Sequence, residues 1–204
     1  MSYQRMPFLI ILSSPSGGGK GTILNKILKR TNNIEYSVSY TTRPPRGNEQ
    51  NGVHYHFVTE TDFKERIAAG DFLEFAQFSG NYYGTSISYI QSLLNKGKHV
   101  IMDIEIQGAA QITTTNFPYV KIFILPPTIE ILKERLANRK TDSAEEIEKR
   151  LMIARYEVTQ INNYDYLVIN DDLDKAIEEV LSIIKAEENR VDRYSKPERE
   201  FLHE

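Results

Sequence analysis

A cluster of glycines around one lysine, at positions 14–22, carries the clearest chemical signal in the chain. Glycines let successive backbone N–H groups turn toward phosphate oxygens, because no side chain blocks their approach. Lys20 supplies a point charge for the outer phosphates, and the N-terminus of a following helix adds a favourable dipole. We therefore predict that a nucleoside triphosphate binds this segment, the phosphate loop, which consists of Ser14, Pro15, Ser16, Gly17, Gly18, Gly19, Lys20, Gly21 and Thr22.

The phosphate loop departs from the general pattern at two positions. That pattern has Gly six residues before the lysine and Ser or Thr directly after it, and this chain has Ser14 and Gly21 there. The usual hydroxyl ligand of magnesium is therefore missing, although Thr22 follows at once. The alternative is a glycine-rich turn that only connects a strand to a helix, and the agreement of strand, lysine and helical pattern disfavours it.

Two carboxylates, Asp103 and Glu105, follow a second apolar run. In an enzyme that uses nucleotides, such acids hold magnesium through water or orient a substrate. The alternative is that they cap a helix or lie in a solvated turn.

Three arginines belong to one charged segment. Arg135 and Arg139 are one helical turn apart, so both guanidiniums can point the same way, and Arg150 follows. Arginines that a closing segment brings in stabilise the charge that spreads during phosphoryl transfer. A solvated helix face explains the same residues, and the residues alone leave both interpretations open.

The region 37–86 contains side chains suited to a second ligand. Arg43 and Arg46 are close enough in the sequence to clamp one phosphate, with Tyr55 and Tyr83 as neutral donors. Glu74 lies within an apolar strand pattern, where a lone charge is costly. A buried carboxylate there needs hydrogen-bond donors, and a purine base could provide them.

Elements that alternate between strand and helix position these residues. Apolar runs predict strands at 9–12, 99–104, 119–125 and 166–169, and helical patterns follow the phosphate loop and recur at 86–96, around 132–136 and at 173–185. This alternation predicts a parallel, doubly wound sheet that binds ligands at the carboxyl ends of its strands. Ser14, Asp103 and Asn170 all lie at or just after the carboxyl ends of predicted strands, as that rule requires.

Three further segments complete the predicted organisation. The region 37–86 predicts strands at 53–58 and 72–78 around a short helix at 62–69, so we interpret it as an inserted β-rich lobe. The residues after 187 form a charged tail, which we expect to be frayed. Its composition fits a solvated end and a surface for self-association equally well. A capping box starts a helix at Ser143, with an apolar face made of Ile147, Leu151, Ala154, Val158 and Ile161.

Composition narrows the class of protein. The 204 residues suffice for one compact α/β unit with small inserted lobes. A net charge of −3, from 25 basic and 28 acidic residues, argues against a general nucleic-acid surface. The absence of cysteine excludes disulfides and thiolate metal sites. The apolar runs are too short to span a bilayer, and we expect a soluble, cytoplasmic protein without membrane or nucleic-acid partners.

Six blocks of the sequence together resemble guanylate kinases, the P-loop family of nucleoside monophosphate kinases that act on GMP. They lie, in the family's order, at 14–22, 37–46, 51–55, 78–85, 102–108 and 169–173. The resemblance runs from about residue 8 to residue 185, and several blocks are far more specific than a phosphate loop alone.

This resemblance implies ATP-dependent phosphorylation of GMP, and of dGMP, to the diphosphate, with Mg²⁺ bound to ATP as cofactor. It implies a P-loop NTPase-type parallel sheet flanked by helices, with an inserted β-rich GMP-binding lobe and a helical lid. On this chain the core comprises 1–36, 87–126 and 152–204, the GMP-binding lobe 37–86, and the lid 127–151.

The resemblance also implies a role for each matching residue. At the guanine base, Ser39 and Thr85 donate to the carbonyl, and Glu74 accepts from the ring N–H and the amine. The residues that hold the GMP phosphate are Arg43, Arg46, Tyr55 and Tyr83, with Asp103 and Glu105 nearby. Asn170 lies near the adenine of ATP. The residues that act on the transferred phosphoryl group are Lys20, Arg135, Arg139 and Arg150. Magnesium is held mainly by nucleotide phosphates and water, near Asp103, and Gly21 leaves its protein ligand open.

Two other functions fit parts of this sequence. Guanylate-kinase-like domains of scaffold proteins bind peptides and have lost catalysis, but Lys20 and the three arginines argue against that class. Kinases of other nucleoside monophosphates, such as adenylate kinases, also have Gly-Lys-Gly-Thr in their loop. Glu74 together with Ser39 and Thr85 favours guanine over other bases. The oligomeric state stays open.

Overall fold

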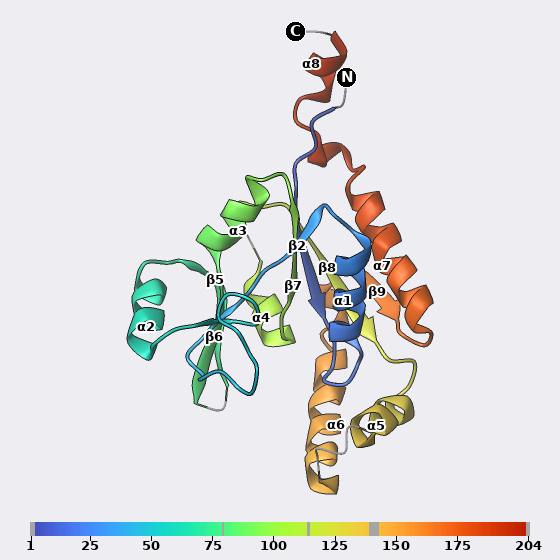
Figure 1. Ribbon diagram of the computed structural model, residues 1–204. Coiled ribbons are helices and arrows are strands. Elements are labelled where there is room, and N and C mark those ends of the chain that lie inside the picture. Colours follow the sequence, from blue (N-terminus) through green and yellow to red (C-terminus); the bar gives the residue numbers. More distant parts are fainter. Residues whose placement is uncertain (1–2, 79, 114, 139–142, 203–204) are drawn as a thin grey trace.

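The computed structural model describes residues 3–78, 80–113, 115–138 and 143–202. Its larger sheet has five strands in the order β2-β7-β1-β8-β9 (Figure 1). Every neighbouring pair in this sheet is parallel, which confirms the predicted α/β fold. The five strands are β1 Leu9–Ser13, β2 Ile34–Tyr36, β7 His99–Asp103, β8 Tyr119–Leu125 and β9 Tyr166–Ile169.

Helices cover both faces of the larger sheet, and β1 shows the effect on the sequence. Ile10 and Leu12 pack with α1 (Lys20–Arg30) and α7 (Leu173–Glu187), whereas Leu9 and Ile11 pack with residues of α3 (Ile87–Leu94) and α4 (Ile106–Gln111). Because neither face meets water, a central parallel strand is apolar throughout rather than alternating. This explains why β1 was predictable from its composition alone.

A smaller mixed sheet, in the order β4-β3-β6-β5, lies to one side of the larger one (Figure 1). Helix α2 (Glu60–Ala68) packs on it through Phe63, whose ring stacks on Phe72 at 4.4 Å between centroids. The strand predicted at 53–58 is mostly wrong, because the turn at Asn51 continues through a bond of 3.1 Å from His54 N to Gln50 O. The four strands are β3 Tyr40–Thr41, β4 His56–Phe57, β5 Phe72–Phe78 and β6 Asn81–Ser86.

Helices α5 (Ile129–Ala137) and α6 (Ala144–Val158) form a separate pair with its own small core. The predicted capping box is confirmed, since Ser143 N donates to Glu146 Oε2 at 2.7 Å and Glu146 N donates back to Ser143 Oγ at 3.3 Å. The predicted apolar face is wrong at its last two positions. The helix ends at Val158, which is 37% exposed, and Ile161 already lies in a 3₁₀ turn.

In the part of the chain that the structure describes, none of the helices combines the length and apolar character needed to cross a membrane.

The expectation of a frayed tail after residue 187 is wrong. Ser195 N donates to Gln4 O at 3.0 Å, and Met6 N donates to Arg193 O at 2.7 Å. Both ends of the chain lie together at the pole of the molecule opposite α5 and α6 (Figure 1). The tail contains a 3₁₀ turn at Val191–Arg193 and a short helix, α8 (Pro197–Leu202).

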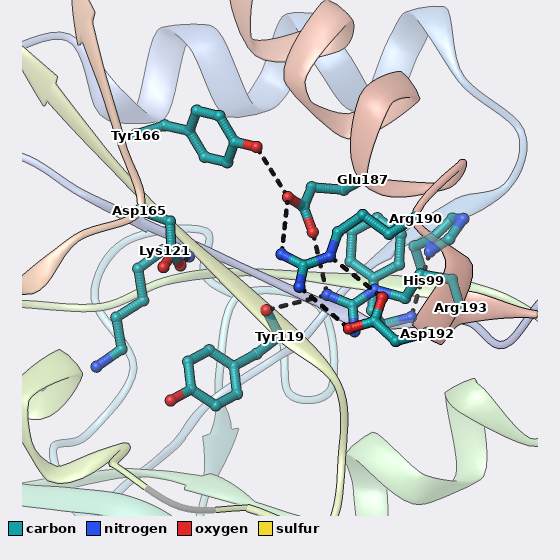
Figure 2. A network of polar contacts seen from close by, with 10 residues as sticks. His99, Tyr119, Lys121, Asp165, Tyr166, Glu187, Arg190, Asp192 and Arg193 are labelled. Carbon is teal, nitrogen blue, oxygen red and sulfur yellow. Dashed lines mark hydrogen bonds and ion pairs between the residues drawn. The ribbon is translucent and has the colours of Figure 1, made fainter.

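A buried ion pair fastens the tail to the sheet (Figure 2). Arg193 Nη2 donates to Glu187 Oε2 at 3.1 Å and to the backbone oxygen of Tyr119 at 3.3 Å. The Tyr166 hydroxyl donates to the other Glu187 oxygen at 2.8 Å, and the Arg193 guanidinium stacks over the Phe8 ring at 5.1 Å. One of the charges that suggested a solvated tail, Arg193, is therefore paired with Glu187 in the interior.

We expect Arg193→Met to lower the free energy of unfolding by about 3 kcal/mol, because Glu187 would remain buried without its main partner. Urea denaturation measures this change. Arg190→Met is the matched control, since the Arg190 side chain is 55% exposed and should contribute far less. Turnover should stay near the wild-type value in both variants. The ion pair lies at the amino ends of β1 and β8, whereas the phosphate loop follows the carboxyl end of β1. Equal destabilisation by the two variants would contradict the conclusion that the buried pair of Arg193 and Glu187 stabilises the fold.

Candidate functional site

The phosphate loop joins the end of β1 to the start of α1, at the carboxyl edge of the larger sheet. Gly17 and Gly19 have φ angles of 94° and 96°, a left-handed conformation that strains any residue with a side chain. A Cβ atom on Gly18 would lie 1.9 Å from Ser14 Oγ. The glycines are thus required by the backbone path and by close packing, and the loop has the shape that phosphate binding needs.

Asn170, at the end of β9, braces the phosphate loop. Its side chain is buried and donates to Gly18 O at 2.8 Å, and a Cβ on Gly19 would lie 2.3 Å from the Asn170 amide nitrogen. Arg135 of α5 donates to the Asn170 backbone oxygen at 2.9 Å. Asn170 therefore links the loop to α5, a role that its predicted place near adenine did not include.

A cavity of about 340 Å³ opens beside Lys20, between the two sheets. Tyr36, Gln107 and Gly108 also line it, and the sequence did not single these out. Lys20 lines the cavity together with six of the nine predicted GMP-binding residues, which are Ser39, Tyr55, Glu74, Tyr83, Asp103 and Glu105.

Glu74 lies at one end of the cavity, and the smaller sheet forms this end. The residue is 8% exposed, and Thr85 Oγ1 donates to its Oε1 at 2.6 Å, with Ser39 Oγ 3.5 Å from Thr85 Oγ1. Burial raises the pKa of Glu74 and the nearby charge of Glu105 adds to this, while the Thr85 hydrogen bond opposes it. A Cβ on Gly108 would lie 2.7 Å from Glu74 Oε2, so α4 can approach this carboxylate only through a glycine.

Asp103 and Lys20 mark the other end, beside the phosphate loop. Tyr36 donates its hydroxyl to Asp103 Oδ1 at 3.1 Å, and Lys20 Nζ donates to Ile104 O at 3.2 Å. Burial and the Asp103 charge raise the pKa of Tyr36, so its hydroxyl keeps the proton that it donates. Glu105 occupies the N-cap position of α4, but its side chain makes no capping bond. Simple helix capping therefore does not account for these acids.

The two arginines of the smaller sheet region lie outside the cavity lining. Arg43 is buried and makes a two-pronged ion pair with Glu49, at 2.8 and 3.0 Å, while its guanidinium lies 5.3 Å from the centre of the Tyr55 ring. The hydrogen bond from Arg43 lowers the pKa of Glu49 to about 2. Arg46 is exposed, and its backbone N–H also donates to Glu49. Glu49 holds this loop in shape, which the sequence did not indicate.

Of the three arginines that were predicted to belong to a lid, Arg135 contacts Asn170 as described, and Arg150 lies partly buried on α6. Arg139 lies outside the described residues.

No group of three His, Cys, Asp or Glu side chains among the described residues is placed to hold a metal ion by itself. Asp103 lines the cavity together with Lys20 and offers a carboxylate of the kind that Mg²⁺ accepts when it arrives with a nucleotide and keeps several water and phosphate ligands.

The chain is similar to known proteins over most of its length. A sequence model of the family described as "Guanylate kinase" matches residues 6–187. The guanylate kinase of Lactococcus lactis is 48% identical over 185 residues, which is 91% of this chain and 90% of that protein. That of Neisseria gonorrhoeae is 47% identical over 186 residues, 91% of each chain. A crystal structure of guanylate kinase from Anaplasma phagocytophilum superposes with a TM-score of 0.77 at 29% identity, covering 97% of this chain and 94% of that one.

Proposed function

Because this chain belongs to the guanylate kinase family, and thus phosphorylates GMP to GDP with ATP, we propose how its residues divide that reaction. The observation that carries the proposal is the single cavity with Glu74 at one end and Lys20 at the other. If the guanine base of GMP binds beside Glu74, the phosphate of GMP points toward Lys20, where the phosphate loop would hold ATP. GMP, and by the same contacts dGMP, would be the acceptor.

In this proposal Glu74 recognises the guanine base. Its carboxylate can only accept hydrogen bonds, and guanine offers two adjacent donors, the ring N–H and the amine. Thr85 donates to Glu74, so it fixes the carboxylate, and Ser39 is left to donate to the guanine carbonyl. The phosphate of GMP would lie near Tyr55 and Tyr83, within reach of Arg43 and Arg46 once these turn toward it.

In this proposal the phosphate loop and the arginines of the lid segment stabilise the phosphoryl group during its transfer. Backbone N–H groups of the loop would hold the ATP phosphates, and Lys20 would stabilise the charge that develops on the transferred group. Asn170 would lie at the adenine side while keeping the loop in shape. Arg135, Arg139 and Arg150 would approach when the lid, residues 127–151, closes together with the GMP-binding lobe, residues 37–86. Closure would also exclude water, which otherwise hydrolyses ATP.

Magnesium would be held mainly by the nucleotide phosphates and water, near Asp103 and the Thr22 hydroxyl. When bound it neutralises phosphate charge, and Asp103 would orient its water ligands. ATP and GMP as substrates, and a chain without cysteine, support a cytoplasmic setting.

A coupled assay of ADP release with GMP, AMP or dTMP as acceptor tests this proposal. We expect kcat/KM for GMP to exceed that for AMP by about ten-thousandfold, as sites built on such hydrogen bonds allow. A reaction without acceptor measures background hydrolysis of ATP and is subtracted. Comparable efficiency with AMP or dTMP would show that Glu74 does not read guanine.

A further inference from the structure

The last residue of α4, Gln111, pairs with the backbone of the smaller sheet. Phe75 N donates to Gln111 Oε1 at 3.2 Å, and Gln111 Nε2 donates back to Phe75 O at 3.0 Å. Strand β5 lies at the edge of this sheet, so one row of its backbone groups faces away from β6. The side-chain amide of Gln111 therefore takes the place of a neighbouring strand at this one residue.

This pairing bears on the base site because Phe75 directly follows Glu74. The Phe75 N–H belongs to the planar peptide group that joins the two residues, so its bond to Gln111 fixes the backbone from which the Glu74 side chain extends. About one turn earlier on α4, a Cβ atom on Gly108 would lie 2.7 Å from Glu74 Oε2. Helix α4 thus meets Glu74 twice, at its carboxylate and at the peptide that follows it.

Helix α4 is in turn fixed to the larger sheet. Lys121 of β8 is buried, and its Nζ donates to Ala109 O at 2.8 Å. Figure 2 shows this side chain directed away from the buried ion pair of the tail. A positive charge is favourable there, because the last carbonyl groups of a helix carry partial negative charge. Ala109 also packs in one cluster with Leu9 and Ile11 of β1. Helix α4 therefore connects the two sheets, between which it lies (Figure 1).

We propose that Gln111 is a positioning residue for GMP: through Phe75 it holds Glu74 at the distance from the phosphate loop that GMP spans. This distance matters because the smaller sheet provides Glu74, whereas the larger sheet provides Asp103 and leads into Lys20. A ligand that contacts both ends of the cavity binds best when the two ends are already held at its own length. The inference rests on the proposed role of Glu74 at the guanine base.

A purely structural role is the alternative, in which Gln111 only covers the edge of β5. Both roles predict some loss of stability when Gln111 is replaced, so stability does not separate them. The two substrates do. In the proposed function ATP binds at the phosphate loop, on the larger sheet, whereas GMP needs both sheets. Loss of the Gln111 hydrogen bonds should therefore weaken the binding of GMP and leave that of ATP unchanged.

Calorimetric titration of the full chain with GMP, and separately with the magnesium complex of the β,γ-imido analogue of ATP, measures both affinities. Gln111→Met removes both hydrogen bonds and keeps the length of the side chain. The fold should survive, because Gln111 is exposed. We expect Kd for GMP to rise about tenfold, as the loss of two ordinary hydrogen bonds allows, and Kd for the ATP analogue to stay within about twofold.

Steady-state kinetics give a second readout. KM for GMP should rise by about the same factor as Kd, while kcat at saturating GMP stays near the wild-type value, since the lost contacts act on binding alone. Thermal denaturation checks that each variant is folded under the assay conditions.

Gln91→Met is the matched control. Gln91 is also exposed, and its amide donates at 2.7 Å to Asn95 at the end of α3, so both Kd values should stay unchanged in this variant. Gln111→Ala removes the same two bonds without adding a methionine side chain and should weaken GMP as much as Gln111→Met does. An unchanged Kd for GMP in either Gln111 variant would overturn the proposal, and so would an equal rise for GMP and the ATP analogue.

The role of Gln111 and the proposed role of Glu74 can fail separately. If Glu74→Gln loses its preference for GMP over AMP while both Gln111 variants bind GMP normally, only the role of Gln111 is wrong. If Glu74→Gln keeps that preference, the proposed reading of guanine by Glu74 is wrong as well.

Discussion

Lys20→Met is expected to lower kcat by at least about a hundredfold, because a preorganised charge at the phosphoryl group stabilises the transition state more than the bound substrates. The fold should survive, since the lysine makes one hydrogen bond, to Ile104 O, and is only partly buried. The coupled assay at saturating ATP and GMP measures kcat, and circular dichroism with thermal denaturation checks the fold.

Lys26→Met is the matched control for this variant. Lys26 lies exposed on the same helix, six residues after Lys20, and its loss removes the same charge from the chain. We expect its kcat to stay near the wild-type value. A folded Lys20→Met protein with near-normal turnover would remove Lys20 from the mechanism.

The second large effect is expected in base choice. Glu74→Gln should lower the ratio of kcat/KM for GMP to that for AMP by at least about tenfold, because guanine loses one of two acceptors in a buried site. The Thr85 hydrogen bond decides which acceptor is lost. Thr85 donates at 2.6 Å to one oxygen and would hold the amide oxygen there, so the amide nitrogen would face the base. That nitrogen repels the donors of guanine and can donate to the unprotonated ring nitrogen of adenine.

The double variant Glu74→Gln, Thr85→Val separates orientation from charge. Without the Thr85 hydroxyl the amide can rotate and present its oxygen to guanine, so part of the preference for GMP should return. The four proteins of this double-mutant cycle are assayed with GMP and AMP under one condition. An unchanged ratio in well-folded Glu74→Gln would make Glu74 a structural strand residue, with the base read elsewhere.

Parts of the site that depend on neighbouring residues could be predicted from the sequence. The strand β1, the phosphate loop and α1 follow directly in the chain, so their pattern is local. Contacts between distant segments could not be predicted. Asn170 donates to Gly18 O across 152 positions, and Arg135 donates to the Asn170 backbone oxygen across 35.

No strand was predicted where β6 lies, and the tail was wrongly expected to be frayed; both have the same physical cause, because a polar or charged segment is buried when it pairs with a distant segment. The strand β6 is polar along much of its length, yet it pairs with both β3 and β5. The tail after residue 187 is charged, yet Arg193 and Glu187 neutralise each other in the interior. In both places the partner lies in another segment, so the sequence around the residue carries no sign of it.

The hydrogen bond from Ser195 N to Gln4 O holds the two terminal segments of the chain side by side. A short flexible linker could join the two ends, and the chain could then be reopened in an exposed loop without moving the sheet that carries the phosphate loop. A bead or surface attached at either end would likewise hold the protein by the pole opposite α5 and α6 (Figure 1). Single-molecule recordings that test the proposed lid closure could therefore use terminal anchors.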